Sequence, residues 1–257
     1  MEHHTKFGWK PDLPDHRDRL YSVSRYSLEA LENLPQKVDL RETGLLSPIV
    51  DQGDIGACTA FSLVSLLRYD RRKQKLDDYA ISKLFVYYNE REAEGTTSID
   101  NGAELRTGIK VLATLGYCAE DCWPYTKANL YVKPKTDCYI DASDNKAIEY
   151  FRLNNESIFE LKNCLASGFP FVFGATIYRS FYEADTRRGI VHMPRSNDQM
   201  MGGHAMCCVG YDDSIEAFII KNSWGVFVGD QGYYYIPYAY MTNRNISDDF
   251  WTIRLVT

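Results

Sequence analysis

Apolar residues recur at helical spacing from residue 58 onward and predict a helix there. They cover one face and both of its flanks, so most of the helix surface is apolar. A helix of this kind has to be covered by the rest of the protein. The apolar positions are Ala60, Phe61, Leu63, Val64, Leu66 and Leu67.

Three further helices follow from periodicity and from end signals. Residues 81–95 and 103–116 carry helical patterns, and Gly116 suits the end of the second helix. Ser157 and Glu160 form a capping box that opens a short helix stopping near residue 168. The segment between residues 123 and 145 contains prolines and is expected to be an irregular connection.

The second half of the chain has a different pattern, which predicts strands. Short apolar and aromatic runs alternate with turn signals such as "DDS" and "GDQG". A helical first half and a strand-rich second half predict an α+β protein with two lobes and a site between them. The predicted strands lie in residues 169–178, 189–193, 204–212, 216–224 and 232–240.

Domain boundaries follow from composition. Residues 1–34 are rich in proline and charge and are expected to form an extended N-terminal arm. Residues 35–257 form the main domain, with a helical lobe over about 45–145 and a β lobe over about 146–245.

Charge and hydropathy exclude several partners. The chain has 257 residues, 45% of them hydrophobic, and a net charge of -6 without a basic stripe. Nucleic acid is therefore not expected as a partner. No stretch reaches the ~20 apolar residues of a membrane span, and the N-terminus has no signal-peptide pattern. We expect a cytoplasmic protein, or one released without a recognisable signal peptide.

The seven cysteines do not predict a disulfide scaffold, because their number is odd and the chain is long. Cys118, Cys122 and Cys138 are weak evidence for a zinc site, since no fourth ligand stands at a familiar spacing. No metal and no cofactor are expected. We expect free thiols at all positions.

Cys58 allows two interpretations. It is either a small buried hydrophobic residue or a nucleophile at the start of a helix. A nucleophile needs a base, and His204 follows two glycines at the start of a predicted strand. Asn222 closes a hydrophobic strand eighteen residues later, whereas His192 is interpreted as a structural or surface histidine.

Three blocks in this order, "QGDIGACTAFS", "GGHAMCCVGYD" and "IIKNSWG…GDQGYYYIP", resemble the signature blocks of the papain-like cysteine peptidases. The segment "LPQKVDLRETGLLSPI" resembles the start of a mature enzyme of that family. The resemblance runs from about Leu34 to the tyrosine-rich strand. It implies a papain-like fold, with a helical left lobe and an antiparallel, β-barrel-like right lobe that enclose the active-site cleft.

The resemblance also implies residue roles. Cys58 matches the nucleophile, held as a thiolate with a depressed pKa beside the His204 imidazolium. His204 matches the acid/base and Asn222 the residue that orients it. Gln52 matches the side-chain donor of the oxyanion hole, together with the backbone N–H of Cys58. Substrate contacts are assigned to Gly56, Gly102, Ala103, Gly203 and Trp224.

Two departures from the family pattern stand next to the nucleophile. Ile55 replaces a cysteine that is usually bound in a disulfide, and Thr59 replaces the usual aromatic residue. In the substrate-binding loop, Ala103 replaces a usual glycine. The missing disulfide is consistent with a reducing compartment or with a microbial origin.

The sequence therefore predicts a papain-like cysteine endopeptidase that acts on peptides or proteins. Two alternatives remain, an acyltransferase or amidase with the same catalytic groups and a catalytically silent binding module. The arm occupies the place of a propeptide and is predicted to act as an intramolecular inhibitor, with Trp9, Leu13 and Leu20 as apolar anchors. The competing interpretation is a strap fixed elsewhere or a disordered tail.

Overall fold

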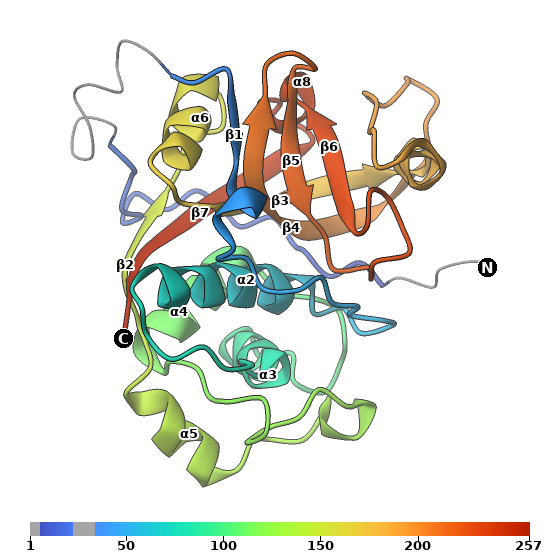
Figure 1. Cartoon of the computed structure of the whole chain (residues 1–257). Helices are drawn as coiled ribbons and strands as arrows, with labels where there is room; N and C mark the ends of the chain where they lie inside the picture. Colours follow the sequence, from blue (N-terminus) through green and yellow to red (C-terminus); the bar gives the residue numbers. More distant parts are fainter. Residues whose placement is uncertain (1–5, 23–33) are drawn as a thin grey trace.

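The computed structural model describes residues 6–22 and 34–257. A sheet of seven strands forms the upper part of the molecule and four helices gather below it (Figure 1). The chain is therefore an α+β protein, as predicted. The lower helices are α2 (Cys58–Lys73), α3 (Lys83–Ala93), α4 (Leu105–Thr114) and α5 (Thr136–Ser143).

The sheet is antiparallel throughout, in the order β2-β7-β3-β4-β5-β6, and the short β1 pairs with β4. β4 is the longest strand and contacts both β3 and β5, so residues on it reach the middle of the sheet. The strands are β1 (Lys37–Asp39), β2 (Ala147–Arg152), β3 (Phe171–Tyr178), β4 (Met200–Asp212), β5 (Ala217–Lys221), β6 (Tyr233–Pro237) and β7 (Ser247–Val256).

Short helices complete the β part. α6 begins where the capping box predicted, because the Ser157 hydroxyl accepts a hydrogen bond from the Glu160 amide at 3.2 Å. The remaining helices of the described residues are α6 (Ile158–Ala166), α7 (Arg179–Tyr182) and α8 (Tyr238–Met241), with 3₁₀ turns η2 (Leu40–Thr43), η3 (Lys127–Asn129) and η4 (Glu183–Arg187).

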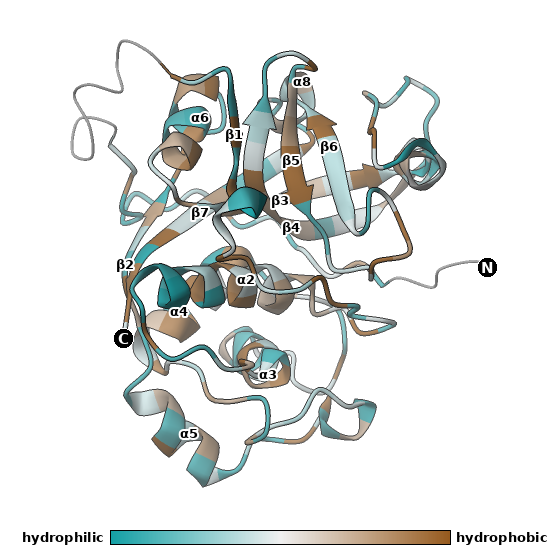
Figure 2. Cartoon of the chain, in the orientation of Figure 1, coloured by the Kyte–Doolittle hydropathy of each residue, from teal (hydrophilic) through white to brown (hydrophobic). Residues whose placement is uncertain are grey.

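Helix α2 lies at the junction of the two parts. It packs against β4 and β7 on one side and against α3 and α4 on the other. Its first ten residues are all buried, as its apolar surface predicted. Its C-terminal end carries Arg71, Arg72 and Lys73, which suit the negative end of the helix dipole. Figure 2 shows this change from hydrophobic to hydrophilic colouring along the helix.

Several elements differ from the sequence-based expectation. The irregular segment contains α5, and residues 189–193 form no strand beyond one isolated bridge from Ile190 to Tyr235. Strands β1, β2 and β7 were not predicted. Most of β7 is buried, and a strand buried on both faces lacks the polar alternation by which strands are recognised. No helix in the described ranges combines the length and apolar character needed to cross a bilayer.

All seven cysteines lie in the described residues and are free thiols. We therefore expect alkylation under denaturing, non-reducing conditions to add seven adducts, measured by intact mass. Prior reduction should leave this number unchanged. A lower number before reduction than after it would contradict the prediction, because it would reveal a disulfide.

Candidate active site

Cys58 is the first residue of α2, and Ala57 before it provides no side-chain cap. The amides of the first turn therefore remain available to other acceptors, and the helix dipole favours negative charge at this end. The sulfur of Cys58 is completely buried and accepts a hydrogen bond from the Ala205 amide of β4 at 3.4 Å. This contact joins the helical part to the sheet at the candidate nucleophile.

His204 lies next to Ala205 on β4 and is oriented by Asn222. The His204 Nε2 atom is 2.8 Å from Asn222 Oδ1, which also accepts the Ser223 amide at 2.8 Å. An amide oxygen can only accept, so Nε2 carries the proton and Nδ1 of the neutral ring has a free lone pair. The Trp224 ring stacks on the imidazole with a centroid distance of 4.7 Å and covers this hydrogen bond.

Gln52 is fixed from three sides. Its Oε1 atom accepts a hydrogen bond from the Ser223 hydroxyl at 2.6 Å, and its backbone carbonyl accepts one from the Tyr125 hydroxyl at 2.9 Å. Its Nε2 atom donates to the carbonyl oxygens of Ile55, at 2.9 Å, and of Lys6, at 3.1 Å. The side-chain donor thus already holds a carbonyl oxygen, which belongs to the N-terminal arm.

The backbone of the arm crosses the site between the loop at Ala103 and strand β4. On one side, the amides of Gly8 and Trp9 donate to the Gly203 carbonyl at 3.1 and 2.9 Å. On the other side, the Ala103 amide donates to the Gly8 carbonyl at 2.8 Å, and the Lys10 amide donates to the Ala103 carbonyl at 3.1 Å. Gly203 and Ala103, both predicted substrate contacts, therefore contact the arm.

Two glycines permit this close approach. A Cβ atom at Gly102, where φ is +80°, would lie 2.0 Å from the Gly8 carbonyl oxygen. A Cβ atom at Gly8 would in turn lie 1.9 Å from the carbonyl oxygen of Gly56. Gly56 and Gly102 therefore also border the arm, which leaves no room for another chain at this point.

Two aromatic side chains anchor the arm. Phe7 contacts the rings of His204 and Trp224 edge-on, with centroid distances of 6.3 and 6.4 Å. Trp9 is buried against Gly174 of β3, and its indole nitrogen donates to Asp249 at 2.9 Å.

The anchors proposed from sequence are thus right for Trp9 and wrong for Leu13 and Leu20. The two leucines are 82% and 72% exposed. The hydrophobicity of a residue in an arm does not tell which side faces the protein. Sequence reasoning did not single out Phe7, whose ring contacts His204 and Trp224, whereas the Trp9 ring lies against Gly174 of β3.

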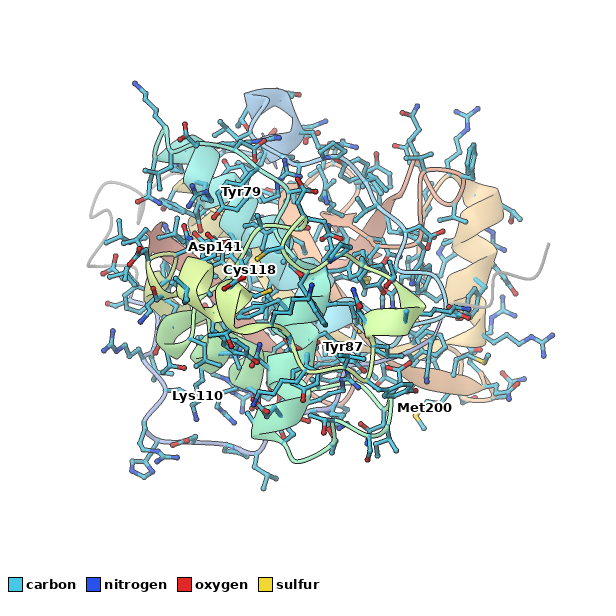
Figure 3. All side chains as sticks on the ribbon, turned by 90° about the horizontal axis from the view of Figure 1, so that it is seen from below. Tyr79, Tyr87, Lys110, Cys118, Asp141 and Met200 are labelled. Atoms are coloured by element: carbon cyan, nitrogen blue, oxygen red, sulfur yellow. The ribbon has the colours of Figure 1, made fainter. Side chains whose placement is uncertain are left out.

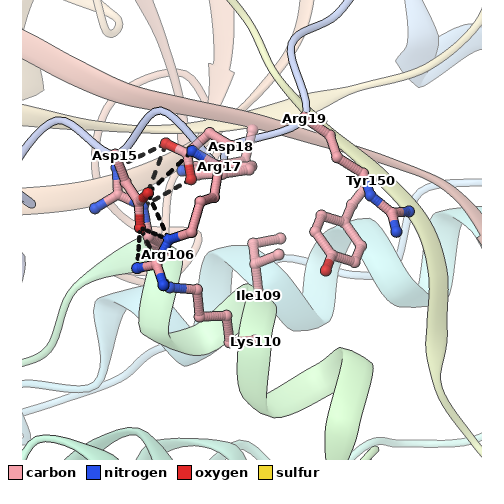
Figure 4. A pocket seen from close by; sticks show the side chains of 9 residues that line it. Asp15, Arg17, Asp18, Arg19, Arg106, Ile109, Lys110 and Tyr150 are labelled. Atoms are coloured by element: carbon pink, nitrogen blue, oxygen red, sulfur yellow. Dashed lines mark hydrogen bonds and ion pairs between the residues drawn. The ribbon is translucent and has the colours of Figure 1, made fainter.

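Ion pairs hold the part of the arm beyond Trp9. Arg106 of α4 pairs with Asp12 at 2.8 Å and with Asp18 at 2.7 Å (Figure 4 shows Asp18). Arg152 of β2 binds the same two carboxylates and also Asp249, at 3.0 Å. Asp12 and Asp249 are fully buried in this network, where charge pairs are only weakly screened by water.

Burial under the arm changes the acid–base properties of the pair. It raises the pKa of the Cys58 thiol to about 12, although the Ala205 and Gly8 amides partly oppose the shift. Burial also lowers the pKa of His204 to about 4, although the hydrogen bond that the ring donates to Asn222 partly opposes the shift. The predicted thiolate–imidazolium pair is therefore wrong for this arm-covered state. Both groups are neutral here, because excluding water disfavours either charged form.

Sequence reasoning missed the residues that support the site. Asp100 accepts hydrogen bonds from the Gly56 amide at 3.2 Å and from the Tyr87 hydroxyl at 2.5 Å. Thr59, which departs from the family pattern, donates to the buried Glu90 of α3 at 2.8 Å. Burial raises the pKa of Glu90 to about 8. None of these pairs is close in sequence, so no local motif marks them.

Comparison with known proteins agrees with this geometry. Residues 34–251 match the model of the papain family cysteine proteases. An uncharacterised peptidase C1-like protein of Acanthamoeba polyphaga mimivirus is 37% identical over 98% of this chain and 87% of its own length. A cathepsin B-like protein of Giardia intestinalis is 32% identical over 89% of this chain and 76% of its own.

Among solved structures, xylellain, a cysteine protease from Xylella fastidiosa, superposes with a TM-score of 0.90 at 40% identity. The match covers 99% of this chain and 97% of xylellain. The fold, the order of the cysteine, histidine and asparagine blocks and these similarities lead to one conclusion. The chain belongs to the papain family of cysteine peptidases.

Proposed function

We propose that this peptidase hydrolyses peptide bonds through an acyl-thioester on Cys58, and that its N-terminal arm restrains it. The observation that carries the proposal is the junction of α2 and β4, where Cys58 lies against Ala205 beside His204. The free lone pair on His204 Nδ1 can take the thiol proton, and Asn222 keeps the ring in the required tautomer.

In the proposed reaction, the Cys58 sulfur attacks the substrate carbonyl, and the thiol proton passes to His204 Nδ1. The developing oxyanion accepts hydrogen bonds from Gln52 Nε2 and from the Cys58 amide. His204 then protonates the leaving amine, and water deacylates the enzyme with His204 as the base. The bond from Gln52 Nε2 to the Lys6 carbonyl supports this role, because it places a carbonyl oxygen at the donor.

The restraint follows from what the arm occupies. It takes the Gln52 donor, the backbone groups of Gly203 and Ala103 and the space above the sulfur. Ordering the arm costs roughly 1–2 kcal/mol per residue. A buried Trp contributes roughly 3 kcal/mol and each hydrogen bond about 1 kcal/mol. No single anchor is sufficient, so Trp9, the backbone pairing and the carboxylates at Arg106 and Arg152 have to act together.

In a chain whose arm is displaced by Trp9→Ala, we expect Cys58→Ala to abolish hydrolysis of a fluorogenic peptide, since no nucleophile remains. His204→Ala should lower kcat/KM by at least about a thousandfold. His192→Ala is the matched control, because His192 is exposed, and should retain full activity. An inactive His192 variant with an active His204 variant would refute the assignment of the base.

Labelling separates the two alternatives. A thiol-directed irreversible peptide inhibitor should modify Cys58 in the chain with a displaced arm. Labelling without peptide hydrolysis would indicate transfer to an acceptor other than water, and absence of labelling would indicate a silent fold.

We expect Gly8→Ala and Trp9→Ala, both in the full chain, to raise peptidase activity. The first places a Cβ atom against Gly56, and the second removes about 3 kcal/mol of apolar burial, roughly a hundredfold in the docking equilibrium. Leu13→Ala is the control within the same arm, since Leu13 is 82% exposed. Equal activity of all four proteins would show that the arm does not restrain the enzyme.

The pH dependence of His204 gives an independent test. With the arm docked, its pKa is about 4, below the ordinary 6.5. The docked state is therefore most favourable above about pH 6.5, where the His204 ring is neutral with the arm docked or displaced. As the pH falls from 6.5 towards 4, the ring of the displaced state takes up a proton and docking becomes less favourable. We expect the His204 ring resonances to titrate near pH 4 in the wild type and at higher pH in the Trp9→Ala protein, measured by NMR. A titration near 6.5 in both proteins would contradict burial by the arm.

A further inference from the structure

Three cysteines converge in the helical part, away from the active site. The Sγ atoms of Cys118, Cys122 and Cys138 all lie within 4.8 Å of one another. Cys118 and Cys122 follow α4, and Cys138 lies on α5, so the cluster joins two segments of the chain. Cys118 and Cys138 are fully buried, whereas Cys122 is partly exposed and gives access from the solvent.

A carboxylate stands beside the three thiols. Asp141 lies one turn after Cys138 on α5 and next to Cys118 in Figure 3. Its Oδ2 atom accepts the Ala119 amide at 2.9 Å, which fixes the carboxylate at the edge of the cluster.

The spacing fits a tetrahedral metal centre. Zn–S bonds of about 2.3 Å place two sulfur ligands of one ion about 3.8 Å apart. Three sulfur atoms within 4.8 Å of one another need only a small contraction to reach that distance. Three thiolates select a soft or borderline ion such as Zn²⁺ over Mg²⁺ or Ca²⁺.

We propose that Cys118, Cys122 and Cys138 bind one Zn²⁺ ion as a structural centre of the helical part. The fourth position is left for water, because the Asp141 carboxylate lies outside the group of close ligand atoms and accepts the Ala119 amide. Binding releases three thiol protons to the solvent, and the resulting centre of three thiolates and one Zn²⁺ ion has a net charge of -1. No electron transfer is involved, and the competing chemistry of the same atoms is a disulfide between two of them.

The centre would stabilise a segment that contacts the active site. Residues 123–126 follow Cys122 directly, and the carbonyl oxygen of Trp123 accepts the Ser82 hydroxyl at 2.6 Å. Tyr125 donates to the Gln52 carbonyl at 2.9 Å. A metal ion tying Cys122 to α5 would therefore hold Tyr125 in place, without touching substrate.

The test measures zinc in the full-length protein purified under reducing conditions and supplied with one equivalent of Zn²⁺. We expect one zinc per chain by native mass spectrometry, and a thiolate-to-metal charge-transfer band when Co²⁺ replaces Zn²⁺. Cys122→Ser should weaken zinc binding at least tenfold in competition with a chelator. It changes the partly exposed ligand, so its fold can be verified by circular dichroism. Cys207→Ala is the control, because Cys207 lies in β4 outside the cluster, and should bind like the wild type.

A second measurement follows the stability of the protein instead of its zinc affinity. Zinc should raise the thermal unfolding midpoint of the wild type and of Cys207→Ala, but not of Cys122→Ser, because a ligand that binds only the folded state stabilises it. Two outcomes would overturn the proposal. One is equal zinc affinity of wild type and Cys122→Ser, and the other is a disulfide within the cluster in place of the ion.

Discussion

The contact between helix α2 and strand β4 positions everything else in the active site. It places the first residue of the helix, Cys58, against the amide of Ala205, and thereby beside His204. A shift of the helix by one turn would move the sulfur by about 5.4 Å, more than a hydrogen bond can span. The apolar surface around α2 prevents such a shift, because the helix is enclosed by the sheet on one side and by α3 and α4 on the other.

The arm affects the candidate site in two ways, because it excludes water and also occupies space there. By covering Cys58 it removes the solvent that would stabilise a thiolate and an imidazolium, and the pKa values of Cys58 and His204 move away from each other. The neutral pair is a poor nucleophile and a poor acid. The Lys6 carbonyl also accepts a hydrogen bond from Gln52 Nε2, the donor that we propose for the oxyanion hole.

The candidate catalytic residues are held by side chains from distant parts of the chain. The Ser223 hydroxyl donates to the side-chain oxygen of Gln52, and the Tyr125 hydroxyl donates to its backbone carbonyl. The hydroxyl of Thr59, the residue after Cys58, donates to Glu90. These supports lie in both halves of the molecule. The family disulfide next to the nucleophile is absent, and Ile55 stands in its place. Packing and hydrogen bonds therefore fix the loop before Cys58.

The sequence by itself determined the elements with strong local signals: the buried helix from Cys58, the capped helix at Ser157, the α+β class and the ordered blocks around the four candidate catalytic residues. Periodicity and caps are properties of neighbouring residues, so they can be recognised without a structure. Only the tertiary structure decided which arm residues face the protein, that β7 is a strand, that burial neutralises the catalytic pair and that three cysteines meet. Each of these depends on groups far apart in the chain, and burial and proximity exist only once the chain is folded.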